Sequence, residues 1–431
     1  MCIFYSVIFV FSGLDFLSCT ATAHTKNNNN HGNYGIGVML TNNKGKILYS
    51  KNQDKKFIPA SILKILTSLE AIHFLGENFR FETIFFLDKQ SDLKIKGYGD
   101  PFFTSEMIKD ICNRLSLILK QKKILKIRSI ILDDRFFVSP LNIPGTGRSN
   151  KPYDAPVGAL CANFNTVFFA YNKSENKFVS AESQTPLLSF TKKRIKASGL
   201  HQGRIILSKN KSRIYAGLLI QYFLKLDGIN MICAANKTFK HKDALDCGIK
   251  LGSVKVDDEK ILTWRSPYTL SDIIQKLLRY SNNFTANQIF LYTGAKVLSP
   301  PASLEKGVNT LKNYAKSLGI KRIKIAEGSG LSRKDRITPR EMIKLLFAFM
   351  PYHNLMRKEY TKAEQNKNKV KPEEFYKTGT LNNVRTRAGY FKINGKLLYP
   401  YVIMVNRKKC NYETIKTIKE KLKKIVIENA E

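Results

Sequence analysis

The segment "IPASILKILTSLEAIHFLG", residues 58–76, constrains the fold more than any other part of the sequence. Pro59 favours a helix start and Gly76 a helix end. Between them the pattern is apolar nearly all round, so the helix must be covered on every side by the rest of the chain. Two of the few polar residues, Ser61 and Lys64, are three positions apart and therefore share one helix face.

Strand patterns precede this helix and return near the end of the chain. Residues 34–50, "YGIGVMLTNNKGKILYS", predict a hairpin with an Asn-Lys-Gly turn. Three later segments predict antiparallel strands, the last two joined by an Asn-Gly turn: 374–380, 385–393 and 396–406. A basic helix is expected to close the chain at 411–429.

The middle of the chain has a different pattern. From Phe79 to about Lys255, short β-rich runs alternate with turns and one expected helix near 105–120, which indicates one or two inserted modules. Helical periodicity returns at 266–295, with Ser271 as a plausible N-cap and a break at Ser281-Asn282-Asn283. A further helix is predicted at 339–350, starting with proline.

Three short motifs stand in order along these elements. S-x-x-K places Ser61 and Lys64 at the start of the buried helix, S-x-N places Ser281 and Asn283 between two helices, and K-T-G opens at Lys377 on a late strand. S-x-x-K and S-x-N each recur elsewhere in polar segments, where a solvated surface explains them, whereas K-T-G occurs once. For Lys64 alone a snorkelling lysine, and for Asn283 alone a helix cap, would be the better explanation, but the ordered set favours catalysis.

The chemistry of a serine nucleophile explains the grouping. A hydroxyl needs a base within hydrogen-bond reach, and none of the six histidines has a triad-like setting. Lys64 can serve as that base if burial and a neighbouring cation, Lys377, lower its pKa. The helix N-terminus offers backbone N–H groups near Ser61 for a developing oxyanion. Lys377, Thr378, Gly379 and Thr380 would form a cationic strand edge that binds a substrate carboxylate and an extended peptide.

The formal charge of +38, from 72 Lys+Arg against 34 Asp+Glu, would attract polyanions. The basic residues are scattered rather than gathered in one stripe, and no nucleic-acid-binding motif is recognisable, so we predict no nucleic-acid partner. A lysine-rich solvated surface explains the excess best, with peripheral contact with an anionic wall or membrane surface as the alternative.

The first 23 residues predict a secretory signal peptide, with cleavage before His24 and hence a periplasmic location. Cys19 leaves a lipoprotein as an alternative, although the residues before it match a lipobox poorly. The five cysteines of the mature chain show no disulfide framework and no metal-binding spacing. Cys233 and Cys247 could pair in an oxidising compartment, and the sequence leaves this open. We predict no metal and no cofactor.

Together the motifs and their surroundings identify a family resemblance. S-x-x-K, an S-D-N-type element and K-T-G mark serine β-lactamases and penicillin-binding proteins. The chain resembles the class C low-molecular-mass penicillin-binding proteins, the D-alanyl-D-alanine carboxypeptidase/endopeptidase family. The stretches that carry this resemblance cover essentially the whole mature chain: "PASILKILTSLEA", "GYGDPFFTSE", "ILDDRFF", "YDAPVGALCANFNTV", "SPYTLSDIIQKLLRYSNNFTANQ", "EGSGLSRKDRITP" and "YKTGTLNNVRTRAGY".

The resemblance implies an α/β (α+β) multi-domain fold. Its transpeptidase-like catalytic domain, an antiparallel sheet between helical layers, would comprise 24–75 and 256–431. This domain would be split by a second domain (76–87 and 163–255), which in turn contains a third (88–162).

The resemblance also implies roles. Ser61 would be the acylated nucleophile, Lys64 its base, and Ser281 the proton relay to the leaving group. Asn283, Lys377, Thr378, Gly379 and Thr380 would bind substrate, and the amides of Ser61 and Thr380 would form the oxyanion hole. The implied substrates are peptidoglycan stem peptides, with β-lactam antibiotics as inhibitors.

Two departures from the family pattern stand near the site. Glu327 precedes "GSGLS" where the family usually has Asp or Asn, and the segment before K-T-G is shorter and rich in Lys and Asn. Alternatives to the peptidase are a β-lactamase, which the long insertion disfavours, and a non-catalytic peptidoglycan-binding or scaffolding protein.

Overall fold

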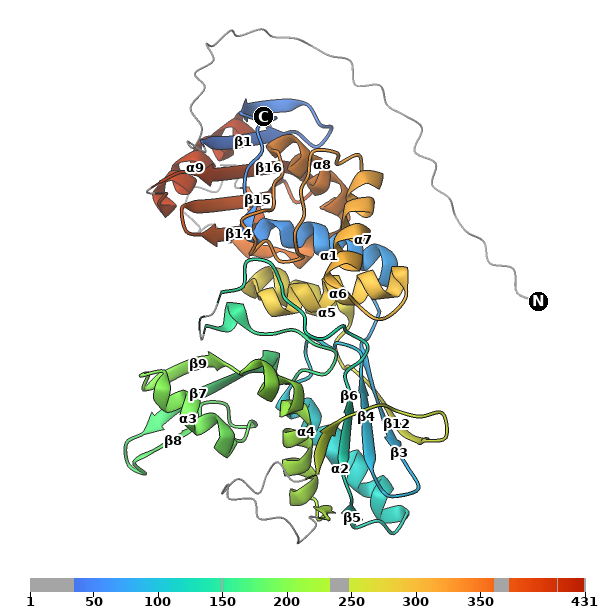
Figure 1. Cartoon of the computed structure of the whole chain (residues 1–431). Coiled ribbons are helices and arrows are strands. Elements are labelled where there is room, and N and C mark those ends of the chain that lie inside the picture. Colours follow the sequence, from blue (N-terminus) through green and yellow to red (C-terminus); the bar gives the residue numbers. More distant parts are fainter. Residues whose placement is uncertain are drawn as a thin grey trace, which may run out of the picture. The chain divides into compact units, whose positions relative to one another are not determined.

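A computed structural model describes residues 35–147, 149, 151–232, 248–359, 372–408 and 410–429 (Figure 1). The predicted signal segment, Cys233 and Cys247 lie outside these residues. In the part of the chain that is described, no helix is long and apolar enough to cross a membrane.

A six-stranded antiparallel sheet joins the two ends of the described chain (Figure 1). Its strand order is β13-β14-β15-β16-β1-β2, so the first strand lies beside the last and pairs with it in the register Met39↔Val402. The predicted N-terminal hairpin and the three late strands are therefore confirmed as parts of one sheet. The strands are β1 (Ile36–Thr41), β2 (Ile47–Lys51), β13 (Arg357–Glu359), β14 (Glu373–Leu381), β15 (Val384–Ile393) and β16 (Leu397–Asn406).

The two faces of this sheet belong to separate apolar clusters. Val402 and Met404 of β16 join the large core that includes helix α8 (Pro339–Phe349). Their neighbours along the strand, such as Ile403, join a smaller cluster with helix α9 (Tyr412–Glu428). Because side chains alternate across a strand, α8 and α9 cover opposite faces of the sheet.

The buried helix predicted from the sequence is confirmed. A 3-10 turn (Ala60–Leu63) leads into α1 (Lys64–Leu75), which ends at Gly76, and residues 64–72 are all buried. Helices α5 (Leu270–Tyr280), α6 (Asn283–Leu298) and α7 (Leu304–Ser317) pack around α1. The N-cap of α5 is Thr269, not Ser271, because Thr269 and Asp272 form a reciprocal capping box.

The middle of the chain forms three further sheets (Figure 1). A five-stranded sheet has the order β11-β6-β4-β3-β12, a three-stranded sheet β8-β7-β9, and a two-stranded sheet β10-β5. Their bounds are β3 (Glu82–Leu87), β4 (Leu93–Gly97), β5 (Lys126–Ile127), β6 (Ile130–Asp133), β7 (Thr166–Asn172), β8 (Lys177–Ser180), β9 (Gln202–Ile206), β10 (Asn230–Met231), β11 (Ile249–Leu251) and β12 (Glu259–Arg265).

The expectation of one helix in this middle region is wrong. The predicted helix is α2 (Ser105–Gln121), but α3 (Lys192–Ala197) and the 18-residue α4 (Lys209–Leu226) are also present, and α4 packs on α2. The predicted fold class, an α+β chain with an antiparallel sheet between helical layers, is confirmed, whereas the boundaries of the nested domains stay a prediction.

Candidate active site

Ser61 lies on the 3-10 turn that leads into α1. Its hydroxyl is 2.9 Å from the amine of Lys64, one helical turn further on. The turn starts in strained backbone, because Ala60 has a φ of 50°, in the left-handed region that non-glycine residues avoid. Gly330 packs so tightly against this turn that a Cβ there would come within 1.9 Å of the Ala60 carbonyl oxygen.

The amine of Lys64 is fully buried and has three partners. Besides the Ser61 hydroxyl, it donates to Asn283 Oδ1 at 2.8 Å and to the carbonyl oxygen of Ser329 at 2.6 Å. All three partners are neutral. A neutral amine could keep two N–H donors on Asn283 and Ser329 and point its lone pair at the Ser61 hydroxyl.

Ser281 and Lys377 form a second hydroxyl–amine pair. Lys377 Nζ donates to Ser281 Oγ at 2.7 Å and to the carbonyl oxygen of Thr378 at 2.6 Å. Ser281 is held in the left-handed region, with φ 61°, at the junction of α5 and α6. Asn282 caps α6 there, since its side chain accepts from the amide of Thr285. The S-x-N break thus supplies one hydrogen-bond partner to each lysine, Asn283 to Lys64 and Ser281 to Lys377.

Burial perturbs both lysines. Burial lowers the pKa of Lys64 to about 7, although the negative charge of Glu327 opposes the shift. Burial also holds the pKa of Lys377 well below its usual range, and the positive charges of Lys64 and Arg357 add to this. The expected repulsion between the two ammonium groups therefore lowers the pKa of Lys377, whereas the pKa of Lys64 is lowered by burial.

The K-T-G segment forms an open edge of the sheet. Strand β13 pairs with β14 from Glu374 to Tyr376, and from Lys377 onward no described strand pairs with this side of β14. Thr378 and Thr380 are exposed along it. Gly379 lies against the turn that carries Ser61, because a Cβ there would come within 2.8 Å of the Ser61 nitrogen and 2.3 Å of Thr386 Oγ1.

A loop that follows α7 supplies contacts that the motif analysis did not assign. Glu327 is fully buried and accepts from the amide and hydroxyl of Ser329, at 2.7 and 2.6 Å, and from the amide of Ser332. This fixes the Ser329 carbonyl that faces Lys64. Next to Glu327, burial and the Glu327 charge raise the pKa of Asp335 to about 9. The unusual glutamate before "GSGLS" was the sequence signal for this loop.

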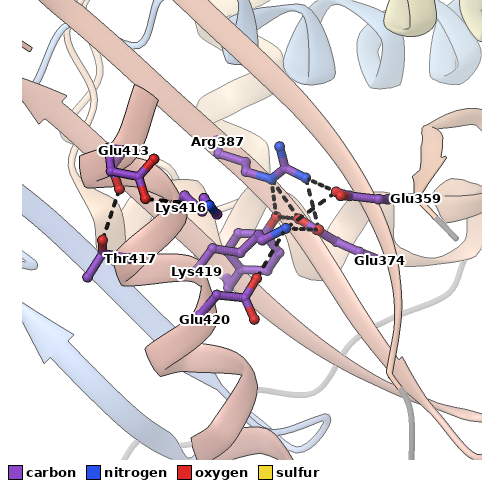
Figure 2. Close-up of polar contacts among 9 residues, drawn as sticks. Glu359, Glu374, Arg387, Glu413, Lys416, Thr417, Lys419 and Glu420 are labelled. Carbon is purple, nitrogen blue, oxygen red and sulfur yellow. Dashed lines mark hydrogen bonds and ion pairs between the residues drawn. The ribbon is translucent and has the colours of Figure 1, made fainter. Parts of the chain in front are cut away.

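A buried charge cluster lies on β13, β14, β15 and α9 (Figure 2). Arg387 donates to Glu374 at 2.6 Å and to Glu359 at 2.7 Å, and Lys419 lies 3.5 Å from both carboxylates. The Arg387 guanidinium also stacks 3.5 Å from the ring centroid of Tyr376, the residue before Lys377. We call these four charged residues the Arg387 cluster.

The structure places the eight predicted site residues in two hydrogen-bonded groups and along one strand edge. Ser61, Lys64 and Asn283 form one hydrogen-bonded group, and Ser281 and Lys377 form another. Gly379 packs on the Ser61 turn, while Thr378 and Thr380 line the open strand edge. Within the described residues, no group of three or more His, Cys, Asp or Glu side chains could hold a metal ion.

Comparisons with known proteins agree with one another. The model of the D-Ala-D-Ala carboxypeptidase 3 (S13) family matches residues 21–428. The D-alanyl-D-alanine carboxypeptidase DacB of Haemophilus influenzae is 24% identical over 344 residues, which are 72% of this chain and 70% of that protein.

Solved structures show the same fold. The crystal structure of penicillin binding protein 4 from Haemophilus influenzae aligns with a TM-score of 0.67 at 20% identity, covering 87% of this chain and 91% of that one. A predatory endopeptidase of Bdellovibrio bacteriovorus, solved in complex with an immunity protein, aligns with a TM-score of 0.52 at 17% identity, covering 93% and 94%.

Proposed function

The chain belongs to the D-Ala-D-Ala carboxypeptidase 3 (S13) family and is a serine-type D-alanyl-D-alanine peptidase, and from this premise we propose how its residues divide the reaction. Ser61 is the nucleophile and Lys64 its base. The substrate is a peptidoglycan stem peptide, attacked at the carbonyl of its penultimate D-alanine.

Acylation begins with the neutral form of Lys64. Its lone pair takes the proton of the Ser61 hydroxyl as the oxygen forms a bond to the substrate carbonyl carbon. The pKa of Lys64, lowered to about 7, supports this role because a large share of the molecules then carry a free base at neutral pH. The amides of Ser61 and Thr380 stabilise the oxyanion, and the tight approach of Gly379 to the Ser61 nitrogen supports their convergence.

Breakdown of the tetrahedral intermediate requires a proton on the leaving nitrogen. Ser281 donates its hydroxyl proton to that nitrogen as the C–N bond breaks, and Lys377 resupplies Ser281 across the 2.7 Å hydrogen bond. When water attacks the acyl-enzyme, its proton passes through Ser281 to Lys377, and Lys64 returns to the departing Ser61 oxygen the proton that it took, which restores both amines and the Ser61 hydroxyl. D-alanine, or the D-centre amine of a cross-link, leaves.

Substrate recognition uses the open edge of β14. Thr378 and Thr380 are exposed hydroxyl donors for the terminal carboxylate, Lys377 adds positive charge, and the uncovered backbone pairs with the extended peptide. Asn283 holds the substrate amide while its Oδ1 orients Lys64. β-Lactams, which carry a carboxylate beside a strained amide, acylate the same serine. Because these substrates belong to the cell wall, the enzyme works in the periplasm after export.

The observation that carries this proposal is the buried Lys64 amine 2.9 Å from the Ser61 hydroxyl with only neutral partners. Labelling with a fluorescent penicillin, followed by mass spectrometry of the tryptic peptides, tests it. We expect one acylated peptide, modified at Ser61, whose label clears over minutes to hours.

Two variants make the labelling decisive. Ser61→Ala should abolish the label, whereas Ser68→Ala, a buried serine two turns further along the same region of chain, should keep it. Label on another serine, or no label on the folded wild-type protein, would contradict the proposal. Turnover within seconds would indicate a β-lactamase instead.

A further inference from the structure

A cavity of about 530 Å³ lies beside the S-x-N junction, outside the group of side chains that carries the reaction. Its walls come from α5, α6, the segment after β4, and the strands β7 and β9. Among the residues that line it are Phe102, Phe164, Arg204, Tyr268, Lys276 and Thr285.

The cavity and the proposed active site adjoin at three consecutive residues. Asn282 lines the cavity, while its neighbours Ser281 and Asn283 bind Lys377 and Lys64. The wall of the cavity is therefore one residue away in sequence from both hydroxyl–amine pairs.

Aromatic rings form one wall of the cavity. Phe102 meets Phe164 at 5.8 Å and Tyr268 at 5.4 Å between ring centroids, both edge to face. Phe164 has a φ of 58°, in a left-handed backbone conformation that a bulky side chain rarely adopts. It lies between Asn163 and Asn165, which are also left-handed and are fixed by buried hydrogen bonds. Strain held in this way is characteristic of ligand-binding positions.

Two polar groups that line the cavity, the Thr285 hydroxyl and the Lys276 ammonium, can form further hydrogen bonds or ion pairs. Thr285 is 1% exposed, and within the described chain its hydroxyl has no hydrogen-bond partner. Lys276 lies 5.4 Å over the ring of Tyr268 and forms no ion pair with a described carboxylate. Arg204 is partly neutralised, because it pairs with Glu182 and donates to Thr166 at 2.9 Å. An unpaired buried hydroxyl is costly unless a ligand completes it.

We propose that this cavity binds the sugar-bearing end of the peptidoglycan strand whose stem peptide is cut at Ser61, an inference that rests on the proposed function. Aromatic walls suit the apolar faces of sugar rings. The free hydroxyl of Thr285 suits an N-acetyl or hydroxyl group, and the ammonium of Lys276 suits the acidic residue near the start of the stem peptide. Three extended residues of the stem peptide span about 10 Å, which is the separation between Ser61 and the cavity that the proposal requires.

The test compares two substrates that differ only in their sugars. Release of D-alanine is measured from a disaccharide-pentapeptide and from the same pentapeptide without sugars. We expect kcat/KM of the wild-type protein to be about tenfold higher for the sugar-bearing substrate. Thr285→Val and Lys276→Gln should each reduce this preference several-fold, and the double variant should remove it.

A matched control and an independent readout separate this inference from the proposed function. Lys312→Gln changes an exposed lysine of α7 that does not line the cavity and should keep the tenfold preference. No sugar preference in the wild-type protein, or a preference unchanged in the double variant, would overturn the inference. Loss of turnover on both substrates in equal proportion would also overturn it, by assigning the cavity to the peptide. Penicillin labelling of Ser61 in the wild-type protein reports on the proposed function independently of the sugars.

Discussion

The protein buries two pairs of cations, and they differ in what surrounds them. In the proposed active site, Lys64 and Lys377 are 0% and 2% exposed, and every described partner of their amines is a hydroxyl, a carbonyl or an amide. In the Arg387 cluster, Arg387 is 2% exposed and Lys419 is largely covered, but both lie against the carboxylates of Glu374 and Glu359 (Figure 2).

The pKa values of the two buried pairs therefore shift in opposite directions. Burial lowers the pKa of Lys64 and Lys377 because no described carboxylate pairs with either amine, and Glu327 offsets the shift of Lys64 only in part. Burial would also lower the pKa of Arg387 and Lys419, but Tyr401 and Glu374 around Arg387, and Glu374 around Lys419, more than offset it and raise both pKa values. A buried amine whose acceptors are neutral has a lowered pKa and can act as a base. A buried cation beside carboxylates stays charged and stabilises the structure through ion pairs.

The largest expected effect follows from removing the base. Lys64→Met keeps the length of the side chain but has no lone pair for the Ser61 proton, so the acylation rate with penicillin should fall by about 10³-fold. Stability should stay the same or rise, since the variant removes an amine that burial disfavours. Stopped-flow acylation and circular dichroism during urea unfolding measure the two. A rate within tenfold of wild type would remove Lys64 from the mechanism.

In the Arg387 cluster, by contrast, removing a buried cation is expected to lower the stability of the fold. Arg387→Met leaves the buried Glu374 with Lys419 as its remaining cation and the Tyr401 hydroxyl as a donor. Breaking a buried ion pair in this way should cost about 3–5 kcal/mol in the free energy of unfolding. Urea unfolding of the variant measures this cost. The double variant Arg387→Met/Glu374→Met, which removes both charges, should recover a good part of it. A loss below about 1 kcal/mol would show that the cluster does not tie the strands together.

Much of the proposed active site could be predicted because local sequence patterns determine the elements on which its residues lie. The apolar helix fixes where Ser61 and Lys64 lie relative to each other, the break at Ser281 marks a helix junction, and K-T-G opens a strand edge. The convergence of these segments came from the family resemblance, since no local rule brings residues 61, 281 and 377 together.

The rest depends on tertiary contacts that no sequence pattern marks. The Ser329 carbonyl is a backbone acceptor, and any residue type could supply it. Helix α4 was missed because Gly217 interrupts its pattern. In the fold this glycine packs closely on the Leu132 side chain, which a Cβ would approach to 3.0 Å. The Arg387 cluster joins three strands and a helix, and its pairs are fixed only by strand register.

The pH dependence of acylation tests whether Lys64 acts in its neutral form. Lys64 must be neutral to act, and its pKa is about 7, so the rate should rise from pH 5 to pH 7 and level off above pH 8. Each pH unit below the pKa should reduce the rate about tenfold, because the neutral fraction falls in that proportion. The rate profile with a neutral thioester substrate measures this. A flat profile from pH 5 to pH 8 would contradict a lysine base.

The same group should make stability depend on pH. Between about 7 and the usual value of 10.5, Lys64 is neutral in the folded protein but protonated in the unfolded chain. The unfolded chain then binds more protons, so folding stability gains up to about 1.4 kcal/mol per pH unit as the pH rises through this window. Lys64→Met should lack this gain, whereas Arg387, charged in both states, contributes none.

The smallest effect concerns Glu327, a carboxylate whose charge influences the pKa of Lys64. Glu327 opposes the fall in the pKa of Lys64, so Glu327→Gln should move the midpoint of the acylation profile down by about one pH unit, to the acidic side. Asp335→Asn is the matched control. Its pKa of about 9 leaves Asp335 protonated at neutral pH, so replacing it removes no charge and should leave the midpoint in place. If both variants shift the midpoint equally, the loop acts on Lys64 through the position of the Ser329 carbonyl. A shift in Glu327→Gln alone assigns the effect to charge, and makes this carboxylate the counterpart of Glu374 near Lys64, one that raises the pKa of the amine without pairing with it.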